Sequence, residues 1–205
     1  MPGRFFLETS VAEIARWMGA ASGDLDEPLR RNIAPGQEIV VFGADRVLRH
    51  MRWGVIPVGR VNARGRPVLE TIVNARSETV FAKSAFEGVE RALVPCDGWY
   101  EWTGPTRSKT AWRIRRRDRA PMAFAAITDE WEAPGGRVVP QVATITCAPN
   151  ADVRDIHHRM GVILDPTQFE TWLTGDVRTA SDLMVPLSDG TLVVEEVRDV
   201  DWAAG

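Results

Sequence analysis

Between residues 39 and 147 the chain is a succession of short β-prone segments separated by turn residues. The segments are rich in Val, Ile, Trp and Phe, and the Pro, Gly, Asn and Asp residues between them are typical of turns. No regular alternation of strands with long helices is visible, which disfavours a parallel βαβ architecture. The expected strands cover residues 39–42, 47–53, 92–94, 99–102, 112–116, 122–127, 142–147 and 192–197.

Two segments predict helices. Ser10 and Glu13 form a capping box before a helix that ends at Gly19, and a second helix is expected over residues 166–173. The run from Pro134 to Gly136 indicates a hairpin loop. We therefore expect an α+β fold, a single domain over residues 1–205 with a largely antiparallel, barrel-like sheet and surrounding helices.

Charge is unevenly spread along the sequence. The net charge is −3, but residues 1–120 carry 20 basic and 14 acidic side chains, whereas residues 121–205 carry 5 and 14. Arginines are dense in residues 107–119, around Trp112, and again in the loop 59–67. Such segments either line a nucleic-acid groove, with an aromatic ring to stack on a base, or form solvated strand faces.

Nothing in the first twenty residues resembles a secretory signal, and no apolar run approaches the roughly 18 residues that a membrane span needs. Cys96 and Cys147 have no CxxC partner, so we expect two buried thiols in a reducing cytoplasm. The sequence predicts a cytoplasmic protein that does not contact membranes.

Candidate acid–base residues lie in two places. His157 and His158 follow one another, and one of them is a candidate proton donor because imidazole titrates near neutral pH. Adjacent histidines in a strand point to opposite faces, so no metal site is expected here. Glu101 is flanked by aromatic residues and is either desolvated, with a raised pKa, or directed outward. Trp53, before Gly54, is a candidate for stacking, whereas most other tryptophans are expected in the core.

Six segments taken together resemble the SOS response-associated peptidase (SRAP) family, also called abasic site processing proteins. Their order and spacing cover roughly the first 165 residues, which makes the resemblance highly specific. The segments are 3–5 (GRF), 31–37 (RNIAPGQ), 51–57 (MRWGVIP), 74–79 (NARSET), 94–102 (VPCDGWYEW) and 156–160 (IHHRM).

The resemblance implies recognition of abasic sites in single-stranded DNA and covalent capture of the ring-opened sugar by a cysteine at position two. The expected roles are orientation of the sugar by Asn74, proton management at the amine by Glu101 and protonation of the ring oxygen by His157. The expected DNA-binding residues are Arg4, Trp53, Arg76 and Arg159. No cofactor or metal is implied, and we expect a monomer that associates with the nucleoid when it is bound to DNA.

The sequence departs from the family at the decisive position, because Pro2 stands where the family has cysteine. Without a thiol, thiazolidine formation is impossible. Three alternatives remain open: an iminium formed by the proline amine after removal of Met1, a binding module without covalent capture, or a substitution in an otherwise ordinary member. A peptidase limited to its own initiator methionine is the alternative function.

Two further expectations concern the rest of the molecule. Gly161 stands where the family usually has proline, and is expected to loosen the turn that carries His157. The surface is expected to show one positive groove around Arg4, Arg76 and Trp53, with the negative charge elsewhere. Residues 166–205 are expected to form a C-terminal helix and strand extension that contributes only packing and solubility.

Overall fold

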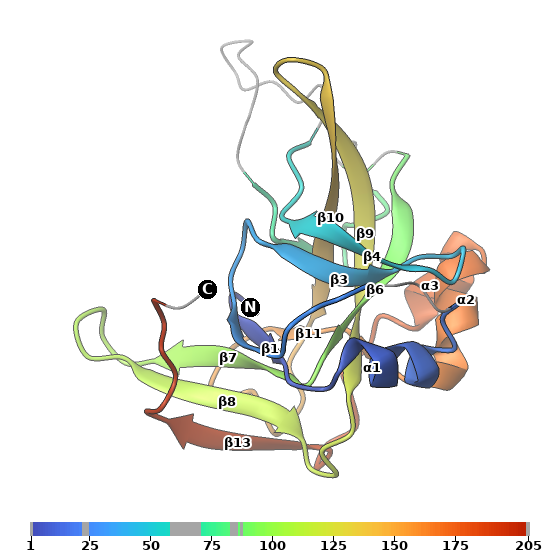
Figure 1. Ribbon diagram of the computed structural model, residues 1–205. Helices are drawn as coiled ribbons and strands as arrows, with labels where there is room; N and C mark the ends of the chain where they lie inside the picture. Colours follow the sequence, from blue (N-terminus) through green and yellow to red (C-terminus); the bar gives the residue numbers. More distant parts are fainter. Residues whose placement is uncertain (1, 22–24, 58–70, 83–85, 87, 204–205) are drawn as a thin grey trace.

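Five strands close into a barrel in the computed structural model, which describes residues 2–21, 25–57, 71–82, 86 and 88–203. Each strand pairs with the next in the order β10-β4-β3-β6-β9, and β9 pairs again with β10, which closes the ring (Figure 1). The strands are β3 (Glu38–Phe42), β4 (Leu48–Trp53), β6 (Glu90–Cys96), β9 (Met122–Ala133) and β10 (Arg137–Cys147). The expected barrel-like sheet is therefore confirmed.

Three short strands extend the barrel. β5 (Asn74–Arg76) lies parallel to β10, β11 (Met160–Gly161) lies antiparallel to β10, and β12 (Ile163–Leu164) lies antiparallel to β9. Within the described residues the sheet is largely antiparallel, as expected, and its parallel pairs are β10 with β4 and β10 with β5. β10 thus brings residues near 74 and near 160 to the same part of the molecule.

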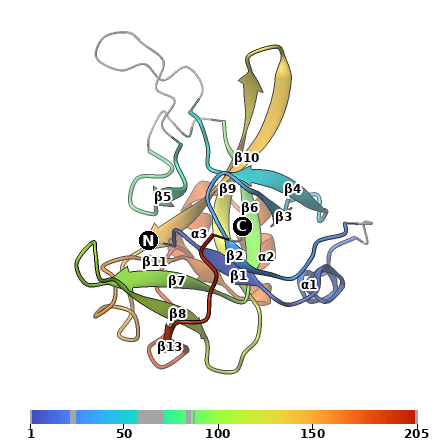
Figure 2. The ribbon, with the colours of Figure 1, turned by 60° about the vertical axis from the view of Figure 1, so that its left-hand side comes forward.

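A second sheet lies beside the barrel, in the order β13-β8-β7-β1-β2. Its first strand in sequence is not at an edge, because β1 pairs with both β2 and β7. The strands are β1 (Phe5–Leu7), β2 (Arg30–Ile33), β7 (Gly98–Thr103), β8 (Thr110–Arg116) and β13 (Leu192–Val197). The start of the chain is consequently held within the molecule, and the N mark lies between β5 and β7 in Figure 2.

The helices lie at the outside of the barrel (Figure 1). α1 (Val11–Met18) has the expected capping box, and Gly19 ends it with a φ of 64°. The second expected helix begins as a 3-10 turn, Pro166–Gln168, and continues as α2 (Phe169–Thr174). α3 (Val177–Asp182) was not expected from the sequence. Trp172 of α2 is fully buried and donates its indole N–H to the carbonyl oxygen of Ala92, which fixes α2 against β6.

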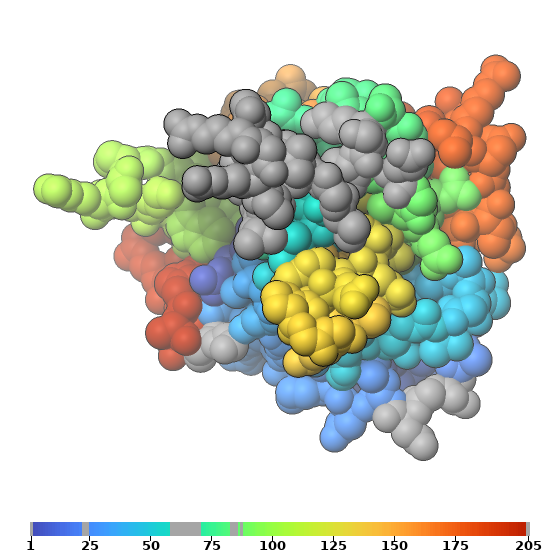
Figure 3. Space-filling model, turned by 90° about the horizontal axis from the view of Figure 1, so that it is seen from above, coloured from blue at the N-terminus to red at the C-terminus, as the bar shows by residue number. Residues whose placement is uncertain are grey.

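The hairpin that joins β9 and β10 extends beyond the barrel. Every residue of β9 from Met122 to Thr128 is buried, and burial falls off only after that point. The expected turn at 134–136 is confirmed, since Ala133 pairs with Arg137 and the positive φ of Gly135 and Gly136 suits glycine. Viewed from above, the tip of this hairpin projects toward the reader, in yellow (Figure 3).

Candidate functional site

The first residues of the chain lie against strand β5. The carbonyl oxygen of Arg4 accepts a hydrogen bond of 2.9 Å from the main chain of Tyr100, which continues the pairing of β1 with β7. Two residues nearer the terminus, the carbonyl oxygen of Pro2 accepts a hydrogen bond of 2.9 Å from the side-chain amide of Asn74. Pro2 is buried, so the second residue belongs to the interior of the site.

The amide of Asn74 has one defined orientation. Its oxygen accepts a hydrogen bond of 2.5 Å from the hydroxyl of Thr144 on β10, which leaves the nitrogen to donate to Pro2. Below it, the indole N–H of Trp53 donates to the carbonyl oxygen of Val73 at 3.2 Å. Thr144 of β10 therefore holds the side chain of Asn74, and Trp53 holds the main chain of the residue before it.

Glu101 on β7 is buried, with 4% of its surface exposed. Burial raises the pKa of its carboxyl group, and the positive charge of the chain's amino terminus acts against that rise. Of the two alternatives for an acid among aromatic residues, the structure shows the desolvated one. A carboxyl group in this setting can hold or release a proton near a terminal amine.

His157 directly follows the turn of residues 151–156 and is half-buried. Its Nδ1 lies 2.9 Å from the main-chain nitrogen of Arg159 and 3.1 Å from the carbonyl oxygen of the same residue, and the shorter contact, in which Nδ1 accepts, favours a neutral ring with its proton on Nε2. Burial lowers the pKa of the imidazole, and the charge of the amino terminus acts in the same direction. The rings of His157 and His158 stack at 4.3 Å, so the expectation of opposite faces is wrong, because these residues are not in a strand.

The two arginines expected at phosphates differ in their surroundings. Arg76 is exposed and lies two residues after Asn74 on β5, so both side chains stand on the same face of the strand. Arg4 is half-buried and donates a hydrogen bond of 2.7 Å to the side-chain oxygen of Asn32. Asn32 in turn donates to the carbonyl oxygen of Asp201, near the end of the described chain.

Two residues expected at the DNA surface are placed otherwise. Trp53 is fully buried and packs edge-on against Phe5, with ring centroids 4.9 Å apart, so it supports the site from beneath and cannot stack on a base. A Cβ atom at Gly54 would lie 2.2 Å from the side chain of Thr71, so this position is closely packed. Arg159 is 9% exposed and its guanidinium is bound to Glu78 and Thr146, so it does not present a free cation to a phosphate.

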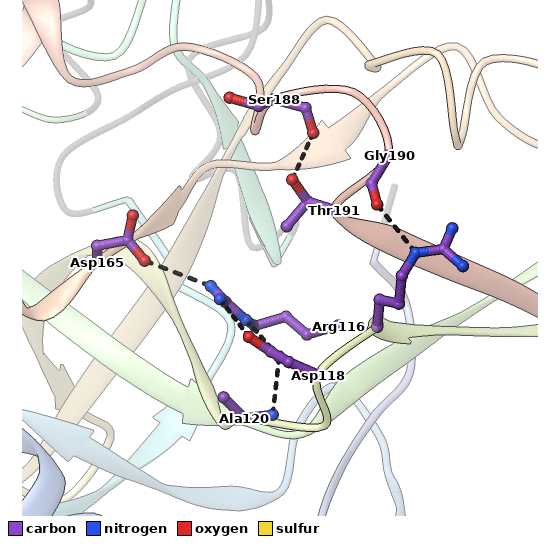
Figure 4. Close-up of polar contacts among 8 residues, drawn as sticks. Arg116, Asp118, Ala120, Asp165, Ser188, Gly190 and Thr191 are labelled. Carbon is purple, nitrogen blue, oxygen red and sulfur yellow. Dashed lines mark hydrogen bonds and ion pairs between the residues drawn. The ribbon is translucent and has the colours of Figure 1, made fainter.

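The arginine-rich strand β8 is neutralised by the acidic end of the chain. Arg113 pairs with Asp199, and Arg115 pairs with Glu195. Figure 4 shows Arg116 between Asp118 and Asp165. The expectation that positive and negative charges lie on separate surfaces is wrong for this face. Strand β13 pairs with β8 and brings acidic residues from 121–205 beside arginines from 1–120. The other basic segment, residues 59–67, lies outside the described residues.

Neither cysteine supplies the thiol that Pro2 lacks. Cys96 and Cys147 are free and buried, as expected. Burial raises the pKa of the Cys96 thiol, and it raises the pKa of Cys147 to about 11. Neither residue is a thiolate near neutral pH, and thiolate is the nucleophilic form.

Gly161 also differs from its expected role. It lies in β11 opposite Thr146, and a Cβ atom at this position would lie 2.3 Å from the ring of Phe124. The close approach of an aromatic ring therefore favours glycine at this position.

Thr144, Asn32 and Glu78 hold site residues but were not singled out from the sequence. Glu78 lies inside the segment 74–79, so its motif was visible although its partner was not. Thr144 carries no local signal, because its contact with Asn74 depends on the pairing of β10 with β5. Among the residues that the structure describes, no group of three His, Cys, Asp or Glu side chains can hold a metal ion, and no helix is long and apolar enough to cross a membrane.

The fold and the site define a barrel protein whose own amino-terminal residues lie in a site with an amide, a buried carboxyl group and an imidazole. The family described as SOS response associated peptidase (SRAP) matches residues 1–200. The chain belongs to this family.

Similar proteins carry the name abasic site processing protein. YoaM of Bacillus subtilis (strain 168) is 34% identical over 149 residues, a match that covers 69% of this chain and 64% of YoaM. HMCES of Gallus gallus is 31% identical over 154 residues, covering 63% of this chain and 46% of that protein. The chain thus matches just under two thirds of YoaM and about half of HMCES. A crystal structure of a Bacteroides thetaiotaomicron protein has the same fold, with a TM-score of 0.82 at 21% identity over 96% of this chain and 92% of that one.

Proposed function

We propose that this protein processes abasic sites in single-stranded DNA and that the amine of Pro2, exposed by removal of Met1, is its nucleophile. The hydrogen bond from Asn74 to the carbonyl oxygen of Pro2 carries the proposal, because it fixes the second residue where a reactive terminus would have to lie. The membership of the SRAP family and the relatives named as abasic site processing proteins support a role at such lesions in DNA.

The remaining residues fit this chemistry. With Nδ1 accepting from the N–H of Arg159, the neutral ring of His157 would direct an Nε2–H toward the sugar and donate a hydrogen bond to the ring oxygen as the sugar opens to its aldehyde. Glu101 has a raised pKa, and the amino terminus whose charge acts on it precedes Pro2 by one residue, so after removal of Met1 this carboxyl group would take the proton that the Pro2 amine loses on attack. Arg76, exposed on the face of β5 that carries Asn74, is placed to contact a neighbouring phosphate.

The reaction has three balanced steps. The nitrogen of Pro2 forms a bond to the first carbon of the aldehyde, and the carbonyl oxygen leaves as water with the amine proton and one further proton, giving an iminium. The iminium acidifies the adjacent carbon, whose proton passes to a base while its electron pair expels the 3′ phosphate. Water then hydrolyses the iminium, which returns the amine and releases an unsaturated aldehyde on the cleaved strand.

A trapping experiment tests the proposal. The protein is incubated with a single-stranded oligonucleotide bearing one abasic site, with and without borohydride, and resolved on a denaturing gel. We expect an adduct only with borohydride, strand cleavage without it, and a loss of both in Glu101→Ala and His157→Ala. His50→Ala is the matched control, because His50 is half-buried on β4 and paired with Glu27.

Other outcomes point elsewhere. A heat-stable adduct that needs no borohydride would contradict the amine mechanism. Tight, salt-sensitive binding without an adduct would contradict catalysis and leave a binding module. The variant Pro2→Cys restores the family's residue, so the remaining site residues should then give a stable adduct without borohydride.

A further inference from the structure

The guanidinium of Arg159 joins three parts of the chain. It makes a two-point contact with the carboxylate of Glu78, at 2.5 and 2.9 Å, and donates at 2.5 Å to the carbonyl oxygen of Thr146 on β10. Glu78 lies in the turn that follows β5, and the main-chain N–H of Ser77 also bonds to Thr146. Arg159 therefore fastens the turn after β5 and strand β10 to the loop that carries His157.

The main chain of the same residue sets the imidazole. The N–H of Arg159 donates to Nδ1 of His157 at 2.9 Å, and the carbonyl oxygen of Arg159 lies 3.1 Å from that nitrogen. The shorter contact is the one with the N–H, in which Nδ1 accepts, and this arrangement favours the tautomer with its proton on Nε2. The geometry of this contact depends on where the main chain of Arg159 lies, and its side chain is anchored by Glu78.

The position of Glu78 in the sequence adds a second link. Glu78 follows Asn74 by four residues, in the same segment, and Val80 at the end of the turn is fully buried. Any displacement of this segment relative to the loop of residues 157–159 would change the separation of Asn74 and His157. The ion pair between Glu78 and Arg159 thus links the segment that carries Asn74 to the loop that carries His157, and it limits changes in the distance between them.

We propose that Glu78 is a positioning residue for His157, acting through Arg159, and that the pair keeps the imidazole in its Nε2-protonated form and in register with Asn74. Arg159 accordingly serves the site from within and not as a phosphate contact. This inference rests on the proposed function only for the role of the His157 N–H in the reaction. Its test needs no DNA.

The test is the tautomeric state of His157, measured by two-bond ¹⁵N–¹H correlation spectra of the three histidines. In the unaltered protein we expect Nδ1 of His157 to be unprotonated. In Glu78→Gln we expect the ratio of the Nε2-protonated to the Nδ1-protonated form to fall about fivefold, as for the loss of one ordinary hydrogen bond. Arg159→Lys, which cannot make the two-point contact, should give the same fall.

Two comparisons make the result decisive. Glu195→Gln breaks another two-point arginine contact, with Arg115, on the second sheet, and should leave the His157 spectrum unchanged. Glu78→Asp keeps the charge but shortens the side chain, and should give an intermediate ratio, which provides a milder variant if Glu78→Gln does not fold. An unchanged tautomer ratio in both Glu78→Asp and Arg159→Lys would overturn the proposal, as would an equal change in Glu195→Gln.

Discussion

The side-chain amide of Asn74 donates a hydrogen bond to the carbonyl oxygen of Pro2, 72 residues earlier in the chain. The same amide accepts from Thr144, so the position of the chain's second residue is set by a strand pair of the barrel. In this way the fold turns an ordinary chain terminus into a fixed part of the site.

Replacing Asn74 should therefore reduce the yield of the Pro2 adduct, because the second residue loses the hydrogen bond that holds it. We expect Asn74→Ala to reduce the borohydride-trapped adduct by about tenfold, the upper range for one lost hydrogen bond. Thr144→Val keeps the shape of its side chain but frees the amide to rotate, and should cause a smaller loss. The measurement is adduct yield at fixed time on a denaturing gel. Equal yields in all three proteins would contradict this role for Asn74.

Glu101 should show opposite effects on activity and stability. Because burial raises the pKa of this carboxyl group, its ionised form costs the fold stability, and that cost grows as the pH rises above the ordinary value of 4.5. We expect Glu101→Gln to raise the melting temperature at neutral pH, with little effect at pH 4. Its adduct yield should fall about 100-fold, as for the loss of an acid–base group.

Thermal melts at both pH values check the first expectation, and adduct yield checks the second. A melting temperature that falls at neutral pH would show that the charged carboxylate is stabilised by its surroundings and would contradict the expected cost of its burial.

The ion pair of Glu78 with Arg159 should contribute to stability over a defined pH range. The hydrogen bond between the Glu78 carboxylate and Arg159 lowers the pKa of Glu78 from 4.5 to about 2. The stabilisation is therefore complete above pH 4.5 and is lost as the pH falls toward 2. Since the side chain of Glu78 is 55% exposed, solvent screening limits the contribution to about 1–2 kcal/mol.

Urea unfolding between pH 2 and pH 6 measures this contribution. The free energy of unfolding should fall less steeply toward low pH in Glu78→Gln than in the unaltered protein. Parallel curves would mean that the ion pair is too screened to matter.

Gly161 provides a test of packing behind the site. A Cβ atom there would lie 2.3 Å from the ring of Phe124, so Gly161→Ala should cost about 1–3 kcal/mol through overpacking. Phe124→Leu removes the obstructing ring. Gly161→Ala should therefore cost less stability when it is added to Phe124→Leu than when it is made in the unaltered protein. Additive losses in the double variant, measured by urea unfolding, would place the strain elsewhere.

The sequence predicted the features that depend on local patterns. The capping box at Ser10 and the hairpin at 134–136 are local signals, and the structure confirms both. The short strands β1, β2 and β5 were missed because three or four residues carry too little periodicity, and their partners are remote in sequence.

The surroundings of the candidate site residues could not be predicted for the same reason. Trp53 and Arg159 were matched to DNA-facing positions by motif, but their environment is set by Phe5 and Glu78, which come from other elements. The charge of β8 was misjudged because its neutralising partner, β13, follows it by about 80 residues, as the pair Arg115–Glu195 shows. The number of charged side chains follows from the sequence, but the pairing of the strands determines which of these side chains form ion pairs.

Peptide mapping of the borohydride-trapped adduct by mass spectrometry tests whether Pro2 is the nucleophile. The chain has only two lysines, Lys83 and Lys109, so few other amines compete for the aldehyde. We expect Met1 to be absent and the sugar-derived mass to lie on the peptide that begins with Pro2. An adduct on Lys83 or Lys109, or an N-terminal peptide that retains Met1 and carries no added mass, would contradict it.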